Sequence, residues 1–235
     1  MGAQKVIDGL FWFMAFLFST TVHEAAHSFV AMRSGDLTAY QGGQVSISPI
    51  PHIRREPIGM VLVPLFTAFL NGWAFGWASA PYDPVWADRN PRKAALMSVA
   101  GPAGNFLIAL AAWGLLRLGL SLDFFTIPHE ISFSHLVDYT SGGPRGASAF
   151  LAQALSVLLM LNVLLGTFNL LPLPPLDGAS AVTLLLPEGL AERYRSIVLN
   201  PQFSLLGLLV AWQLFPPIAR PLFRLVVQSL YAGAL

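Results

Sequence analysis

The chain has 235 residues, of which 55% are hydrophobic and only 11% are charged, and its formal net charge is +1. Soluble domains carry about 25% charged residues, so this composition indicates an integral membrane protein, and the near-neutral charge gives no indication of nucleic-acid binding. The chain has no cysteine, which excludes disulfides and thiolate metal sites and leaves His, Asp and Glu as candidate metal ligands.

Five hydrophobic runs follow one another along the chain, and a helix of about 20 apolar residues is enough to cross the hydrocarbon core of a bilayer. The polar connections 35–56 and 121–145 are too short to fold independently. The sequence therefore predicts an all-α polytopic membrane protein with about five to six hydrophobic segments, in which residues 1–235 form a single membrane-embedded domain. The runs are 9–32, 57–82, 94–116, 146–176 and 196–219.

The first run contains His23-Glu24-Ala25-Ala26-His27, where ionisable groups are costly. On a helix, residues i and i+4 lie on one face, so both imidazoles can bind one Zn²⁺ while Glu24 reaches a metal-bound water. This is the arrangement of a metalloprotease. The alternative is a polar cluster satisfied by neighbouring helices, but ionisable residues inside membranes are by default functional.

The first polar connection contains a short β pattern at 42–50, where paired glycines precede Val45 and other apolar residues that alternate with serine. This pattern predicts a short strand or hairpin near the metal, although a plain connecting loop is the alternative. An edge strand there could hold an extended substrate peptide, so Gln44, Val45 and Ser46 are candidate substrate-binding residues. His52, in the same connection, is expected to be a solvated loop residue rather than a metal ligand.

The second run, 57–82, is interrupted by Pro64 and by an Asn-Gly turn at Gly72. If every run crossed the membrane completely, the histidines would lie on the opposite side from everything after Leu171. We therefore expect one segment, most simply this one, to be re-entrant or broken, which leaves its flanking connections on the same side. The basic residues divide almost evenly between the two sides, so the sequence does not predict the orientation.

Catalytic zinc usually has three protein ligands and one open position, so the two histidines need a third ligand. Asp177 is the best candidate, because Pro172, Pro174 and Pro175 stop the fourth run just before it. Irregular backbone at membrane depth is tolerated where it is buried in protein or lines a cavity. The alternative role for Asp177 is to cap a helix.

Three asparagines are candidates for polar contacts in the site. Asn162 and Asn169 are seven residues apart and share a helix face, so both can point toward the cavity or form helix-to-helix hydrogen bonds. Asn105 ends a Gly-rich motif that allows tight packing beside the first helix, and its amide either contacts substrate or supports the site. Asn169 and Asn105 are therefore included as candidate substrate-binding residues.

Three motifs occur in an order that resembles the site-2 protease family of intramembrane zinc metalloproteases. They are HEAAH at 23–27, AGPAGN at 100–105 and FNLLPLPPLDG at 168–178. The stretch 45–64 is also similar to compact prokaryotic members that lack a PDZ or CBS domain. The resemblance extends over residues 10–186.

The resemblance implies one Zn²⁺ per chain, held by His23, His27 and Asp177, with Glu24 as the general base. It also implies that Asn169 contacts substrate or the oxyanion, and that the protein is a multi-pass protein of the cell membrane. The expected partners are the lipid bilayer and membrane-protein substrates with one or several spans, whose peptide bonds are cleaved within or near their transmembrane helices. The oligomeric state is not predicted.

Two other classes of function remain open from the residues. A membrane metal transporter also uses intramembrane His, Asp and Glu, but it leaves the HExxH spacing and the proline-rich Asp motif unexplained. A catalytically silent scaffold that binds membrane helices is disfavoured by the intact Glu24.

Overall fold

Helices dominate the computed structural model, which describes residues 3–140, 145–198 and 201–232. Within these residues, four helices are long and apolar enough to cross a membrane, and a shorter apolar helix covers Ile58–Asn71. The expected all-α polytopic class is confirmed. The four candidate spans are Val6–Ser34, Pro91–Ser121, Gly146–Asn169 and Ser204–Tyr231.

The elements follow in chain order. The first half contains α1 (Ala3–Ser34), α2 (Thr38–Gln41), α3 (Pro49–Arg55), the π-helical turn η1 (Ile58–Leu62), α4 (Val63–Asn71), α5 (Pro84–Arg89) and α6 (Pro91–Ser121). The second half contains β1 (Phe125–Thr126), β2 (Asp138–Tyr139), α7 (Arg145–Asn169), α8 (Asp177–Ala181), η2 (Val182–Leu185), α9 (Glu188–Val198), η3 (Pro201–Phe203) and α10 (Ser204–Tyr231).

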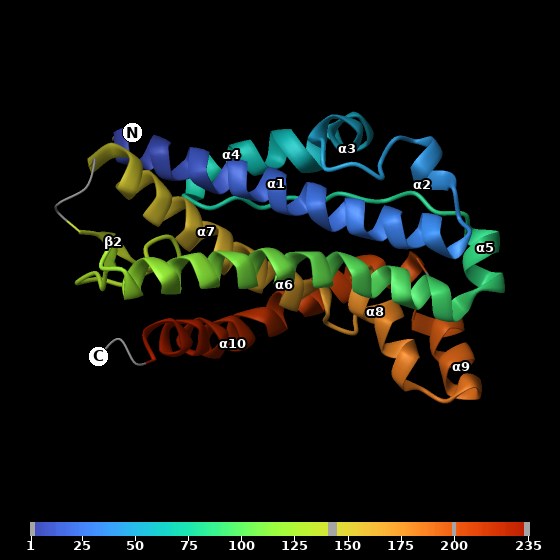
Figure 1. Ribbon diagram of the computed structural model, residues 1–235. Coiled ribbons are helices and arrows are strands. Elements are labelled where there is room, and N and C mark those ends of the chain that lie inside the picture. The colour runs from blue at the N-terminus through green and yellow to red at the C-terminus, as the bar shows by residue number, and fades with distance from the viewer. Residues whose placement is uncertain (1–2, 141–144, 199–200, 233–235) are drawn as a thin grey trace.

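Helix α6 runs through the middle of the bundle, with α1 on one side and α10 on the other, and α7 crosses it (Figure 1). One apolar cluster joins α1, α4 and α7 around Phe16 and Val157. A second joins α6, α7, α10 and the β-hairpin around Leu116 and Met160. Most side chains of α10 are exposed, as expected for a helix that faces lipid. The tight core is therefore the α1–α6–α7 unit that carries the site.

The second hydrophobic run forms a re-entrant hairpin, as expected. After η1 and α4, the chain turns at Gly72, whose φ of 79° is left-handed, and residues 74–83 return along α1 to α5 (Figure 1). The backbone N–H of Trp77 donates to the Gly59 carbonyl at 3.1 Å. A Cβ at Gly59 would lie 2.3 Å from the Trp77 carbonyl oxygen, so only glycine allows the two arms to approach this closely.

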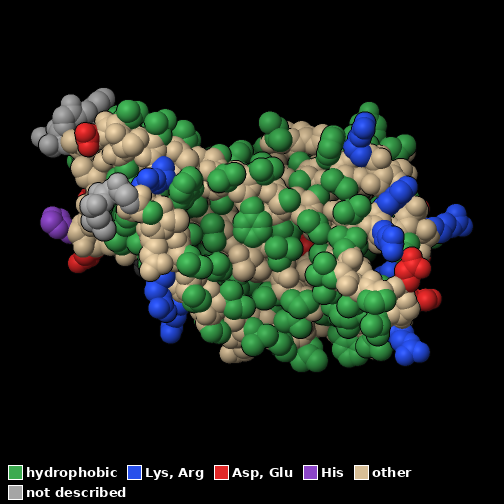
Figure 2. All heavy atoms as spheres, turned by 60° about the horizontal axis from the view of Figure 1, so that its bottom comes forward, with side chains coloured by type: hydrophobic (Ala, Val, Ile, Leu, Met, Phe, Trp, Pro, Cys, Tyr) green, Lys and Arg blue, Asp and Glu red, His purple; other side chains and the backbone are tan. Residues whose placement is uncertain are grey.

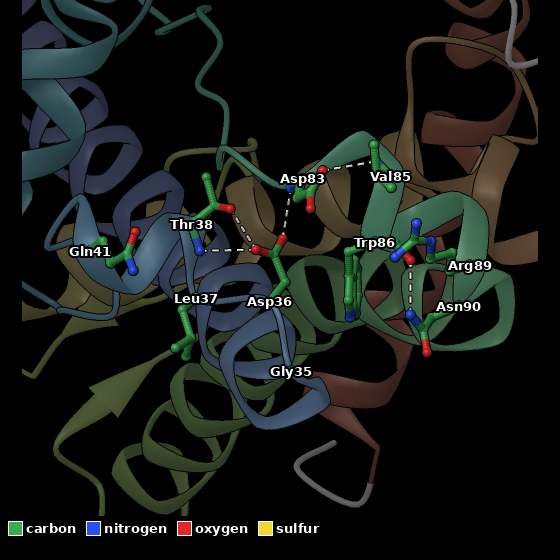
Figure 3. A pocket seen from close by; sticks show the side chains of 10 residues that line it. All are labelled: Gly35, Asp36, Leu37, Thr38, Gln41, Asp83, Val85, Trp86, Arg89 and Asn90. Atoms are coloured by element: carbon green, nitrogen blue, oxygen red, sulfur yellow. Dashed lines mark hydrogen bonds between the residues drawn. The ribbon is translucent and has the colours of Figure 1, made fainter.

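The entrance and exit of this hairpin are held together by the carboxylate of Asp36. It accepts the Thr38 N–H at 2.9 Å and the Asp83 N–H at 2.9 Å, beside a polar cavity of about 450 Å³ (Figure 3). Burial opposes ionisation of this carboxyl, but the hydrogen bonds from Thr38 and Asp83 lower its pKa below the ordinary value. The connections that flank the hairpin therefore meet at one end of the bundle.

The strand predicted at 42–50 is wrong. Residues 42–48 form turns and bends, and α3 begins at Pro49. The Gln44 N–H donates to the Ala39 carbonyl at 2.9 Å, and Gly43 has a φ of 74°, so the backbone curls back on α2. A strand needs a neighbouring strand for its hydrogen bonds. Within the described residues, the two-stranded ladder forms instead in the later connection, where Phe125 pairs with Tyr139.

Charged side chains gather at the two ends of the molecule, and the face between them is mostly hydrophobic (Figure 2). Because the second run is re-entrant, the C-terminus of α1 lies at the same end as α5, the start of α6 and α9 (Figure 1). Exposed basic residues are therefore concentrated at this end in a way that the sequence did not predict. They include Arg33, Arg89, Arg92, Lys93 and Arg193.

Cysteine labelling tests the re-entrant hairpin directly, because the chain has no native cysteine. Leu37 and Tyr82 flank the hairpin, and Leu122 lies at the opposite end of α6; all three are exposed. A membrane-impermeant maleimide should label Leu37→Cys and Tyr82→Cys from one side of sealed vesicles and Leu122→Cys from the other. Labelling of Leu37→Cys and Tyr82→Cys from opposite sides would contradict a re-entrant segment.

Candidate metal centre

Helix α1 presents both histidines of the HExxH motif to the interior of the bundle. His23 and His27 are 6% and 5% exposed, and their Nε2 atoms lie 2.9 Å apart. The other ring nitrogen of each is held from outside α1: His23 Nδ1 lies 2.6 Å from Asn105 Oδ1, and His27 Nδ1 lies 2.7 Å from the Met97 carbonyl. Both contacts come from α6. The two Nε2 atoms therefore point into one small space.

Asp177 reaches the same space from the other end of the sequence. Helix α7 ends at Asn169, the proline-rich segment that follows turns back, and Asp177 is the first residue of α8. A Cβ at Gly178 would lie 2.3 Å from the backbone of Leu170 and Leu171, so glycine lets α8 pack directly on this segment. Asp177 Oδ2 lies 3.1 Å from His23 Nε2, and Oδ1 lies 3.3 Å from His27 Nε2.

The geometry of these three side chains suits a metal cation with tetrahedral coordination. Their ligand atoms lie within 4.8 Å of one another, and the closest distances are 2.9 to 3.3 Å. With bonds of roughly 2.0 to 2.1 Å, two ligands of tetrahedral zinc are about 3.3 Å apart. If both Nδ1 atoms carry the ring protons, three acceptor atoms face one another, and a metal cation between them removes the repulsion.

Helix α6 leaves room for an ion beside the two imidazoles because residue 101 is glycine. A Cβ at Gly101 would lie 2.3 Å from His27 Nε2 and 2.5 Å from His23 Nε2. Any side chain there would occupy the position where the ligands converge. The tight packing expected from the Gly-rich motif is therefore found at the two histidines.

Glu24 is 5% exposed and follows the first histidine, but among the described residues it is not part of the three-residue ligand cluster. The side chain of Asp177 is 20% exposed, so the surface of the protein reaches the site at Asp177.

The candidate substrate-binding residues have different surroundings. Asn105 is fully buried, and its amide is engaged by His23 and Asn162, so the structure does not present it to a substrate. Asn169 is partly exposed, and its Nδ2 donates to the Leu165 carbonyl of its own helix at 3.0 Å. Asn105 therefore supports His23, while Asn169 stays a candidate.

The loop candidates lie between α2 and α3. Gln44 is 2% exposed, and neither its Oε1 nor its Nε2 has a hydrogen-bond partner among the described residues. Val45 and Ser46 are partly exposed. All three stay candidates, although they lie in a curled loop and not in a strand.

His52 was expected to be solvated, and this is wrong. It is 1% exposed, and its Nε2 donates to the Ser46 carbonyl at 3.0 Å. It therefore ties α3 to the loop that carries Gln44 and Ser46. A lone histidine in a polar connection gives no sequence signal for this role, because its partner is a backbone carbonyl supplied by the fold.

A bundle of membrane-length helices that carries HExxH on one helix, with an aspartate brought to both histidines, defines a membrane metallopeptidase. Residues 11–209 match Peptidase family M50. The chain therefore belongs to that family, the site-2 protease family that its three motifs resemble.

Known relatives support this assignment. The chain is 35% identical over 206 residues to YwhC of Bacillus subtilis (strain 168), which carries the name of a zinc metalloprotease; the match covers 83% of this chain and 80% of the relative. It is 28% identical to Rip2 of Mycolicibacterium smegmatis, covering 89% of this chain and 69% of the relative. Against Rip2 of Mycobacterium tuberculosis (strain ATCC 25618 / H37Rv), identity is 30%, with coverage of 83% and 63%. No solved structure matches the chain.

Two neighbouring glycines of α6 provide a matched test of the metal centre. Gly101→Ala places a methyl group against both Nε2 atoms, whereas Gly104→Ala makes ordinary contacts of 3.5 Å or more with α1. We expect Gly101→Ala to lose most bound zinc and Gly104→Ala to keep about one zinc per chain, as measured by mass spectrometry of the metal. Equal zinc content in folded Gly101→Ala and Gly104→Ala protein would show that the ion does not bind against α6.

Proposed function

We propose that this protein is an intramembrane zinc metalloprotease, a single membrane-embedded domain that hydrolyses peptide bonds within or near the transmembrane helices of other membrane proteins. The convergence of His23, His27 and Asp177 inside a bundle of membrane-length helices carries the proposal. Membership of the M50 family and the names of the relatives support zinc as the metal and peptide hydrolysis as the reaction.

In this proposal, His23, His27 and Asp177 hold the zinc, which when bound supplies a Lewis acid for the scissile carbonyl and lowers the pKa of water. Glu24 accepts a proton from the attacking water as that oxygen bonds to the carbonyl carbon. It then gives the proton to the leaving amine as the C–N bond breaks. Its place next to His23, outside the ligand cluster, suits this role.

The substrate must expose its backbone before it can react, because a transmembrane helix hides its carbonyls in hydrogen bonds. We infer that the loop of Gln44, Val45 and Ser46 binds the unwound segment and that Asn169 provides a further polar contact. The Gln44 amide supports this inference, because it is buried with no hydrogen-bond partner among the described residues. Its one acceptor and two donors become available to a peptide backbone when the substrate displaces the side chains that cover it. Helix-breaking residues in the substrate should favour cleavage.

We also infer that the protein is a multi-pass protein of the cell membrane, with the end formed by α5 and α9 facing the cytoplasm. The concentration of exposed basic residues at that end supports this orientation, because cytoplasmic loops carry an excess of Lys and Arg. The metal centre would then lie nearer the cytoplasmic side, since His27 is seven residues, or about 10 Å, from the end of α1 at Ser34.

The orientation predicts which cysteines react on spheroplasts. Impermeant maleimide should label Leu122→Cys before permeabilisation and Leu37→Cys only after it. Leu122 follows the last residue of α6 and Leu37 follows the end of α1, and these two helix ends lie at opposite ends of the bundle. The reverse order of labelling would invert the proposed orientation without affecting the re-entrant hairpin.

Substitution of Glu24 separates proton transfer from metal binding. Glu24→Gln keeps the size of the side chain but cannot accept the proton, so cleavage of a single-span substrate should fall by a factor on the order of 10² to 10⁴. Zinc content should stay at about one per chain. Cleavage would be measured with purified protein in vesicles, and zinc by mass spectrometry.

Asp177→Ala is the matched comparison, because it removes a candidate ligand and should lower bound zinc sharply. Loss of zinc in Glu24→Gln would make Glu24 a ligand or a structural support. Normal cleavage by Glu24→Gln would contradict the proposed mechanism. Wild-type protein that moves zinc across sealed vesicles without cleaving any substrate would instead support a transporter.

A further inference from the structure

We propose that Asn105 is a positioning residue, which fixes the tautomer of His23 so that its Nε2 lone pair faces the metal, and that Asn162 and Ser19 fix the orientation of the Asn105 amide. This inference rests on the proposed metal centre. All four side chains are buried: His23 is 6% exposed, and Ser19, Asn105 and Asn162 are not exposed at all.

The chain of hydrogen bonds begins at a group that can only accept. The Leu158 carbonyl lies 2.8 Å from the amide nitrogen Nδ2 of Asn162, and the same nitrogen lies 2.8 Å from Ser19 Oγ. A backbone carbonyl cannot donate a hydrogen bond, so the amide nitrogen of Asn162 must face it. The Asn162 amide oxygen is therefore directed to the opposite side, toward Asn105.

The orientation of the Asn162 amide then determines the orientation of the Asn105 amide on α6. Its Nδ2 donates to Asn162 Oδ1 at 2.8 Å, and this nitrogen also lies 3.5 Å from the Ser19 carbonyl. Asn105 Oδ1 is consequently the atom that lies 2.6 Å from His23 Nδ1. An amide oxygen can only accept, so His23 carries its ring proton on Nδ1 and leaves Nε2 free to bind the metal.

The second histidine reaches the same tautomer by a simpler route. His27 Nδ1 lies 2.7 Å from the Met97 carbonyl, which can only accept. No side-chain orientation has to be chosen there. Asn105 differs, because an inverted amide would offer a donor to His23 Nδ1, place the ring proton on Nε2 and block one ligand. Therefore only His23 depends on a second amide, that of Asn162, which fixes the orientation of the Asn105 amide.

The hydrogen-bond network joins three helices. Ser19 and His23 are one turn apart on the same face of α1, Asn105 lies on α6 and Asn162 on α7. Metal-binding histidines commonly donate their second N–H to a group that orients the ring, and loss of that group lowers metal affinity about 10- to 100-fold. Here that group is an asparagine whose own orientation is set by the helix packing.

Zinc affinity of the full-length protein tests this role, measured by competition with a chelator. Asn105→Leu removes the acceptor for His23 and should weaken zinc binding about 10- to 100-fold. Asn105→Asp keeps an acceptor for His23 but loses the donor that faces Asn162 Oδ1, so it should bind zinc clearly more tightly than Asn105→Leu. Ser98→Ala on the same helix is the control and should leave zinc affinity unchanged, because the Ser98 hydroxyl donates to the Ala94 carbonyl of its own helix. Equal zinc affinities for Asn105→Leu and wild type would overturn the proposal.

A double-mutant cycle separates orientation from simple helix packing. Asn162→Leu should weaken zinc binding several-fold when residue 105 is asparagine, because the amide can then invert. The same change should not weaken zinc binding in the Asn105→Asp protein, since both carboxylate oxygens accept, no orientation has to be chosen, and the repulsion between Asn162 Oδ1 and the second carboxylate oxygen is removed. An equal loss in both backgrounds would mean that Asn162 acts through packing alone, and would overturn its proposed role.

The absorption spectrum of the Co²⁺-substituted protein gives a readout that does not depend on cleavage. We expect Asn105→Asp to keep the spectrum of the wild type and Asn105→Leu to change it, because only the latter releases the His23 ring. Unchanged spectra for every variant would contradict a positioning role. If wild-type protein binds neither zinc nor Co²⁺, the metal centre itself is wrong, and this result is distinct from failure of Asn105 alone.

Discussion

Two imidazoles and a carboxylate held together among apolar helices are the constraint on which the rest of this structure depends. Hydrocarbon offers no hydrogen bonds, so each buried polar atom must find its partner within the protein. His23 and His27 each direct one ring nitrogen to α6 and the other to the shared space with Asp177. The packing of α1 on α6 therefore also sets the orientation of both histidine rings.

The same constraint explains where the backbone is irregular. The re-entrant hairpin and the proline-rich segment before Asp177 both leave backbone groups outside regular helices. The hairpin packs against α1 and α7, and the proline-rich segment packs against α8 and α10. The hairpin keeps both of its ends on one side, through Asp36 and Asp83. Because of this return, α1 and α8 can approach the same depth from the same end of the bundle, and Asp177 can meet the histidines.

Several residues have contacts in the structure that differ from those predicted from the sequence. Asn105 was a candidate for substrate contact, but its amide is engaged by His23 and Asn162. His52 was expected in solvent, but it is buried against the Ser46 carbonyl. The strand expected at 42–50 is a curled loop. In each case the partner lies on another element or is a backbone group, and neither can be read from local alternation of residue types.

The sequence by itself determined the class of the protein, the histidine pair and the break before Asp177. These follow from local rules: apolar length sets membrane spans, a spacing of four residues sets a shared helix face, and prolines stop a helix. Only the tertiary structure decided that Asn105 faces His23, that Gly101 makes room at the ligands, and that the basic residues flanking the hairpin share one end. These contacts join segments tens of residues apart, so they depend on how the helices pack against one another.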